Sequence, residues 1–163
     1  MSVVVAVVAD GVAYVGGDTL VTTENVSLLS IPKVHRLPNA LVGLVGDCAA
    51  ETRLMRVLQA MPPEATAGDI VAAMTIAVPE VADYGTAEAL IVHPNGMVWV
   101  SDAAIPVTQD WWAIGAGDAV ALGALHALRD RPPRPRVEAA LQAASAVCPS
   151  VGGRLTVHEL HES

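Results

Sequence analysis

The chain opens with a run of apolar residues that is unbroken from Val3 to Val8. A strand with one face in water alternates apolar and polar residues, whereas this run is apolar at every position. The run stops at Asp10-Gly11, a dipeptide typical of tight hairpin turns, and an apolar pattern resumes from Val12 to Val15. The pattern therefore predicts a β-hairpin whose first strand is central and is covered by other layers on both faces.

The first helices are expected after two more short strands, at 34–37 and 40–45. Asp47 can cap a helix that runs to about residue 60, and Thr66-Ala-Gly-Asp69 resembles a capping box that opens a second helix ending at Val78, before Pro79. The later pattern predicts strands at 88–93, 97–101, 111–115 and 154–160, helices at 119–129 and 137–147, and a proline-rich connector at 131–136.

The order of these elements is strands, two helices, strands, two helices and a closing strand. Such an order suggests two sheets that face each other, with a pair of helices outside each sheet. The arrangement explains why the first strand is apolar on both faces, because one face meets a helix layer and the other meets the second sheet. No internal repeat or linker interrupts the pattern, so a single domain spanning residues 1–163 is predicted.

Composition and charge argue against several functional classes. The 163 residues carry nine Lys plus Arg against seventeen Asp plus Glu, and the net charge of -8 argues against binding to nucleic acid or anionic membranes. No apolar stretch approaches the roughly 18 to 20 residues that span a bilayer. A secretory signal pattern is absent, and two cysteines are too few for a disulfide framework. A cytoplasmic protein is therefore expected.

Four sequence motifs carry a resemblance to a known family. They are an N-terminal hydroxyl residue followed by an apolar strand and GGDTLVT (2–22), PKVHRL (32–37), GLVGD (43–47) and AIGAGDAVALGALHAL (113–128). In this order they resemble the proteasome β-subunit family, with a length closest to its HslV branch, and the resemblance covers nearly the whole chain. It implies an α+β protein with the four-layer αββα sandwich of N-terminal nucleophile (Ntn) hydrolases.

Ser2 is the candidate nucleophile, and elementary chemistry supports this role. A serine at the very N-terminus can pass its hydroxyl proton to its own α-amino group, whose unperturbed pKa is about 7.7 to 8.0. One residue then supplies both nucleophile and base. The mechanism requires removal of Met1, which the small side chain of Ser2 favours.

The resemblance assigns the other catalytic roles by position. Asp18 corresponds to the acidic residue that orients a lysine, and Lys33, the only lysine of the chain, corresponds to that lysine. The Gly43 amide corresponds to the oxyanion donor. Each residue has a structural alternative: Asp18 as a turn-capping aspartate, Lys33 as a solvated surface lysine, and Gly43 as a glycine needed for close packing.

Some positions depart from the family pattern. Ala116 stands where the AIGSG motif of the family has a serine, and the loop at 148–152, with Ser150 and Val151, does not clearly reproduce the polar supporting residues of the family. Two hypotheses therefore stay open. The first is a threonine-peptidase-like endopeptidase that forms an acyl-enzyme on Ser2. The second is a catalytically impaired or non-proteolytic Ntn-fold assembly protein, or an amide-transferring relative.

The remaining candidate chemistry is weaker. Cys48, at a helix start, is interpreted as a buried small residue, and His158-x-x-His161 as a surface pair, so no metal and no cofactor are predicted. The resemblance implies a peptide or unfolded protein as substrate and a homo-oligomeric ring. Because the chain has no nucleotide-binding motif, an unfoldase would have to be a separate ATPase.

Overall fold

The computed structural model of the protein describes residues 2–21 and 29–163. Its strands are β1 (Val3–Ala9), β2 (Val12–Gly17), β3 (Leu20–Val21), β4 (Leu29–Ser30), β5 (Val34–Arg36), β6 (Leu41–Gly46), β7 (Ala87–His93), β8 (Gly96–Val100), β9 (Ala104–Val107), β10 (Trp111–Gly115) and β11 (Thr156–His161). Its helices are α1 (Cys48–Gln59), α2 (Ala67–Ala82), α3 (Asp118–Ala127) and α4 (Pro133–Val147).

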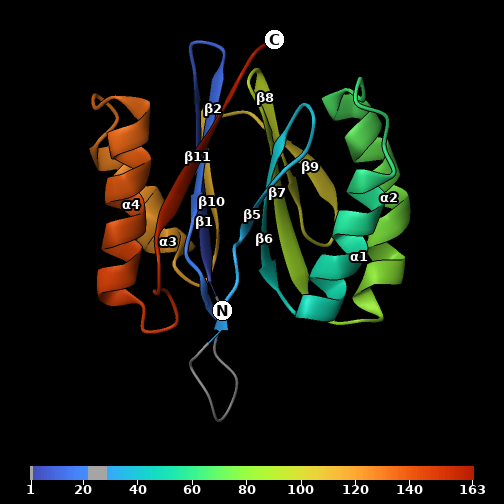
Figure 1. Cartoon of the computed structure of the whole chain (residues 1–163), viewed down its shortest axis with the longest axis horizontal. Helices are drawn as coiled ribbons and strands as arrows, with labels where there is room; N and C mark the ends of the chain where they lie inside the picture. Colours follow the sequence, from blue (N-terminus) through green and yellow to red (C-terminus); the bar gives the residue numbers. More distant parts are fainter. Residues whose placement is uncertain (1, 22–28) are drawn as a thin grey trace.

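These elements form four layers. One antiparallel sheet has the order β10-β1-β2-β11, the other has the order β5-β6-β7-β8-β9, and β3 pairs with β4 in a separate ribbon. Figure 1 shows α3 and α4 outside the first sheet and α1 and α2 outside the second. The predicted α+β, αββα sandwich is confirmed.

The strand β1 is central, as the unbroken apolar run predicts. It pairs with β10 on one side and β2 on the other, and the hairpin to β2 turns through Asp10 and Gly11, at φ 51° and 73°. Val3 and Val5 pack in the cluster that includes α3 and α4 residues, whereas Val4 packs between the two sheets. Both faces of β1 are therefore buried, and the position of Ser2 before this strand is fixed by the core.

Two helix boundaries differ from the sequence prediction. The capping box at Thr66 and Asp69 is present, but α2 continues through Pro79 to Ala82. Its buried positions Ile70, Met74, Ala77 and Val81 keep helical spacing past the proline. The burial of this face outweighs the hydrogen bond that Pro79 cannot donate.

The proline-rich segment is also helical at its end, because α4 begins at Pro133 rather than at residue 137. Proline is well suited to the first turn of a helix, where the backbone N–H has no intrahelical acceptor. The short strand β9 was not predicted at all. None of the helices within the described residues is long and apolar enough to cross a bilayer.

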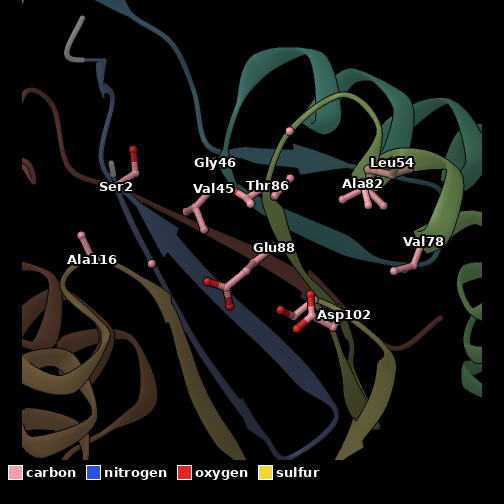
Figure 2. A pocket seen from close by; sticks show the side chains of 15 residues that line it. Ser2, Val45, Gly46, Leu54, Val78, Ala82, Thr86, Glu88, Asp102 and Ala116 are labelled. Carbon is pink, nitrogen blue, oxygen red and sulfur yellow. The ribbon is translucent and has the colours of Figure 1, made fainter. Parts of the chain in front are cut away.

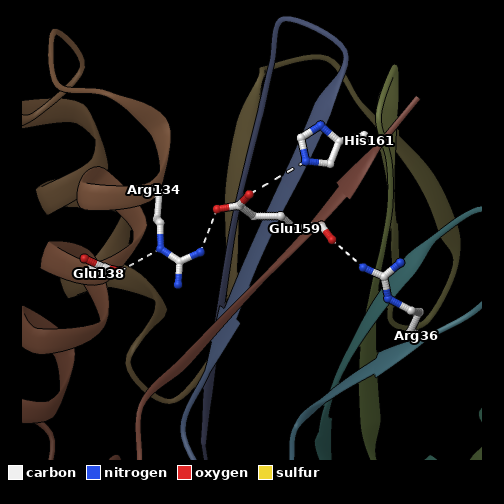
Figure 3. Close-up of polar contacts among 5 residues, drawn as sticks. All are labelled: Arg36, Arg134, Glu138, Glu159 and His161. Carbon is white, nitrogen blue, oxygen red and sulfur yellow. Dashed lines mark hydrogen bonds and ion pairs between the residues drawn. The ribbon is translucent and has the colours of Figure 1, made fainter. Parts of the chain in front are cut away.

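Polar contacts at the surface connect α4, β11 and β5 (Figure 3). Arg134 lies between Glu138 and Glu159, at 3.1 and 2.6 Å, and Arg36 donates a hydrogen bond to the backbone carbonyl of Glu159. His161 lies 3.8 Å from Glu159 and is exposed, as is His158, so the surface-pair interpretation is confirmed. The hydrogen bond from Arg36 to the Glu159 carbonyl joins β5 and β11, which are edge strands of the two sheets.

Candidate active site

Ser2 is held in place by backbone hydrogen bonds at the start of β1. Its carbonyl accepts a hydrogen bond from the Ala116 N–H at 2.8 Å, and the N–H of the next residue, Val3, donates to Oδ1 of Asp18 at 3.1 Å. Ser2 is only 3% exposed, and its hydroxyl lies 3.5 Å from the carbonyl oxygen of Leu20. Met1, whose removal the predicted mechanism requires, lies outside the described residues.

Asp18 joins three segments of the site. Its side chain is fully buried, and its two carboxylate oxygens accept hydrogen bonds from the Val3 and Gly152 N–H groups, both at 3.1 Å. Burial raises the pKa of Asp18, while these hydrogen bonds and the charge of Lys33 lower it. Asp18 therefore ties the end of β2 to the first residues of β1 and to the loop after α4, a wider role than capping its own turn.

Lys33 is buried, with 6% of its surface exposed, so the solvated-lysine alternative is wrong. The first atom of its side chain lies close to the end of β2: a Cβ placed on Gly17 would be 3.1 Å from the Lys33 Cβ. Lys33 forms no ion pair within 4.0 Å among the described residues, and its charge acts on Asp18 through space. It also lowers the pKa of Glu51, a carboxyl whose pKa burial raises.

Gly43 does not reach the pocket. It lies in the middle of β6, opposite Val34 on one side and Leu90 on the other, and it is buried. A Cβ at this position would lie 2.2 Å from Cγ1 of Val4, so the glycine permits the two sheets to pack. The predicted oxyanion role of Gly43 does not fit this geometry, and the close-packing alternative does.

The Gly43→Ala variant is expected to lose stability because its methyl group overlaps Val4 at the interface between the sheets. Overpacking of this kind costs about 1 to 3 kcal/mol. Urea unfolding followed by circular dichroism measures the effect, and Gly123→Ala is the matched control, because nothing lies within 4 Å of a Cβ at Gly123. Equal unfolding midpoints for the Gly43→Ala variant and the wild type would contradict the packing role.

Gly46, which the sequence analysis did not select, lies at the pocket that Gly43 does not reach. The Leu44 N–H donates to the Lys33 carbonyl at 2.9 Å, and the Asp47 N–H donates to the Thr86 carbonyl at 2.8 Å. Because N–H groups alternate in direction along a strand, the Gly46 N–H points toward the side of Lys33. Gly46 is exposed, has φ 133°, and lines the same pocket as Ser2.

A pocket of about 360 Å³ opens beside Ser2. Figure 2 shows that its lining comes from both sheets and from the helices α1 and α2. Val45, Leu54 and Val78 contribute apolar walls, and Glu88 and Asp102 contribute carboxylates. Next to the pocket, the Asp47 carboxylate accepts a hydrogen bond from the N–H of the lining residue Thr86 at 2.8 Å and makes no capping hydrogen bond to α1.

The departures from the family pattern have structural consequences. Ala116 offers no hydroxyl, but its N–H holds the Ser2 carbonyl. The loop after α4 supports Asp18 through the Gly152 N–H rather than through a polar side chain. Cys48 is exposed, so its interpretation as a buried residue is wrong. Among the described residues, no group of three or more His, Cys, Asp or Glu side chains is arranged to hold a metal ion.

The two sheets, the outer helix pairs and the position of Ser2 before a central strand define the fold of N-terminal nucleophile hydrolases. Within that fold class, the chain is similar to eukaryotic HslV from Trypanosoma brucei, with a TM-score of 0.85 and 19% identity over 98% of this chain and 99% of that one. It is also similar to BPH of Thiobacillus denitrificans, with a TM-score of 0.83 and 18% identity over 99% of this chain and 98% of that one. BPH in complex with epoxomicin matches with a TM-score of 0.80 and 19% identity over 99% of each chain. No family model and no curated protein sequence matches this chain.

Proposed function

We propose that this protein is an N-terminal nucleophile peptidase that cleaves peptide bonds through an acyl-enzyme on Ser2, after removal of Met1. The observation that carries the proposal is the placement of Ser2 at a pocket, directly before a buried central strand and hydrogen-bonded through Val3 to the buried Asp18. Lys33 acts on the same carboxylate through its charge. A serine that only began a strand would not need a buried carboxylate that accepts a hydrogen bond from the next residue, nor a buried cation acting on that carboxylate.

The reaction begins when the Ser2 hydroxyl oxygen attacks the substrate carbonyl and its proton passes to the Ser2 α-amino group. The positive charge of Lys33 favours the ionised hydroxyl and the neutral amine. The resulting oxyanion accepts a hydrogen bond from the Gly46 N–H, and the protonated amine then gives its proton to the leaving amine as the carbon–nitrogen bond breaks. Water attacks the Ser2 ester by the same path and regenerates the enzyme.

The proposal includes an assembly and a substrate class. The fold shared with HslV and BPH supports a homo-oligomeric ring that encloses the active sites and admits peptides or unfolded proteins. Among the described residues, large apolar side chains are exposed at Ile76, Ile105 and Val147, and they can serve subunit contacts. A separate ATPase would deliver folded substrates, and the compartment is proposed to be the cytoplasm.

Light scattering and peptide turnover test the proposal together. The purified protein is expected to be a ring-sized oligomer and to hydrolyse unstructured peptides, with inhibition by epoxomicin, the compound bound to BPH. It is not expected to degrade a stably folded protein on its own. A stable monomer at micromolar concentration would contradict the ring, and an oligomer without turnover would favour the rival assembly-protein hypothesis.

The pH dependence of kcat/KM is expected to show two steps on the acid side. Protonation of the Ser2 α-amino group removes the base and gives a slope of about one in a logarithmic plot. Burial raises the pKa of Asp18, so at still lower pH this carboxyl also takes up a proton and loses an acceptor for Val3 or Gly152. Below that pKa the slope should steepen; a slope that stays at one over the whole acid range in which the protein remains folded would contradict the role of ionised Asp18.

A further inference from the structure

The pocket beside Ser2 combines apolar walls with two carboxylates. Glu88 lies on β7, at the end of the space between the two sheets, and is half-buried. Asp102 lies on the exposed turn after β8. No cationic side chain is among the lining residues that the structure describes. The pocket therefore presents negative charge next to the proposed nucleophile, with nothing of opposite sign within the lining to neutralise it.

Glu88 is oriented by a specific contact. The indole Nε1 of Trp99, on the neighbouring strand β8, donates a hydrogen bond to Oε2 of Glu88 at 2.9 Å. Within the described residues, the second carboxylate oxygen of Glu88 accepts no hydrogen bond. Figure 2 shows this carboxylate in the pocket with Ser2 and Asp102. A glutamate fixed in this way offers one oxygen to a ligand.

We propose that this pocket selects a positively charged side chain, lysine or arginine, within two residues of the bond that Ser2 cleaves. Lysine and arginine have an apolar stem and a charged head, which match the wall of Val45 and Val78 and the carboxylates of Glu88 and Asp102. The net charge of -8 also attracts basic peptides at long range. This inference rests on the proposed function, because it names the substrate class of the same site.

Matched peptides that carry arginine or its neutral isostere citrulline test the proposal. In a random peptide mixture, cleavage sites mapped by mass spectrometry should be enriched in lysine and arginine at one position near the cut. The arginine peptide should have a kcat/KM about tenfold higher than the citrulline peptide, because citrulline keeps N–H donors but lacks the positive charge that strengthens a hydrogen bond to a carboxylate. The Glu88→Gln variant should bring this ratio toward one, since glutamine keeps an acceptor for Trp99 but lacks the charge.

The Asp102→Asn variant should lower the ratio less, since Asp102 is exposed. The Glu64→Gln variant changes an exposed residue outside the pocket and is the control that should leave the ratio unchanged.

Binding of fluorescently labelled arginine and citrulline peptides to the Ser2→Ala variant separates this inference from the proposed function. If the wild type does not cleave, but the arginine peptide still binds about tenfold more tightly in a Glu88-dependent way, the pocket assignment stands and the peptidase fails. Cleavage with no arginine preference, or equal binding of both peptides, would overturn the pocket assignment.

Discussion

The Ser2→Ala variant is expected to lose peptide turnover by about 10³-fold or more, because it removes the hydroxyl that forms the acyl-enzyme in the proposed mechanism. Its assembly and thermal stability should be unchanged. Ser2 makes its strongest contacts through its backbone, whereas its hydroxyl has one weak contact at 3.5 Å to the Leu20 carbonyl. Fluorogenic peptide assays, with light scattering on the same samples, measure both properties.

Two further variants test whether the Ser2 hydroxyl is the nucleophile. Ser2→Thr should retain turnover, since threonine keeps the hydroxyl and adds a methyl group that restricts its rotamers. Cys48→Ala should have wild-type turnover, which excludes the exposed thiol as the nucleophile. If the Ser2→Ala variant kept wild-type turnover, the N-terminal nucleophile mechanism would be wrong and the assembly-protein hypothesis would replace it.

The Lys33→Met variant is expected to lower kcat/KM by about 10² to 10³-fold, because it removes the charge that favours the ionised hydroxyl and the neutral amine. Methionine fills a similar volume, so the buried site stays packed. The change also leaves Asp18 and Glu51 without the cation whose charge lowers their pKa values, so both carboxyls should titrate at higher pH than in the wild type.

Arg129→Met is the matched control for this change, since it removes a cation from an exposed position outside the pocket. The control should keep wild-type kcat/KM and the wild-type acid limb. If the Lys33→Met variant were folded and as active as the control, Lys33 would be a structural residue and not part of the catalytic machinery.

Much of the fold follows from local sequence patterns. The run from Val3 to Val8 is apolar at every position, and this predicts a strand buried on both faces, which β1 is. The dipeptide Asp10-Gly11 fixes the first turn because both residues adopt positive φ. The sequence predicts that α2 ends before Pro79, because a proline locally disfavours helix. The helix continues to Ala82 because Val81, beyond the proline, is buried, and this burial depends on the tertiary packing.

The site could be predicted in part. Ser2, Asp18 and Lys33 were selected from the family motifs. The structure links Asp18 to the start of β1 through its carboxylate and places Lys33 beside the end of β2. The choice between Gly43 and Gly46 could not be made from spacing alone, because it depends on strand register and on which side each N–H points. The sequence did contain one indication of Gly46, since it is the last residue of β6, two residues before α1 begins at Cys48.

Glu88 could not have been found from the sequence, because nothing local distinguishes it from other glutamates that precede an apolar run. Its role depends on the contact with Trp99 across two strands and on the proximity of β7 to the start of β1. Such groupings arise from the packing of the two sheets, and only the three-dimensional arrangement shows them.

The identity of the nucleophile is tested most directly by mass spectrometry of the protein after incubation with epoxomicin. The N-terminal peptide is expected to begin at Ser2, without Met1, and to carry the mass of the inhibitor, while the peptides that contain Cys48 and Cys148 carry none. Prior conversion of Ser2 to alanine should abolish the adduct. Quantitative retention of Met1 in protein that turns over peptides, or an adduct at any other residue, would contradict the account.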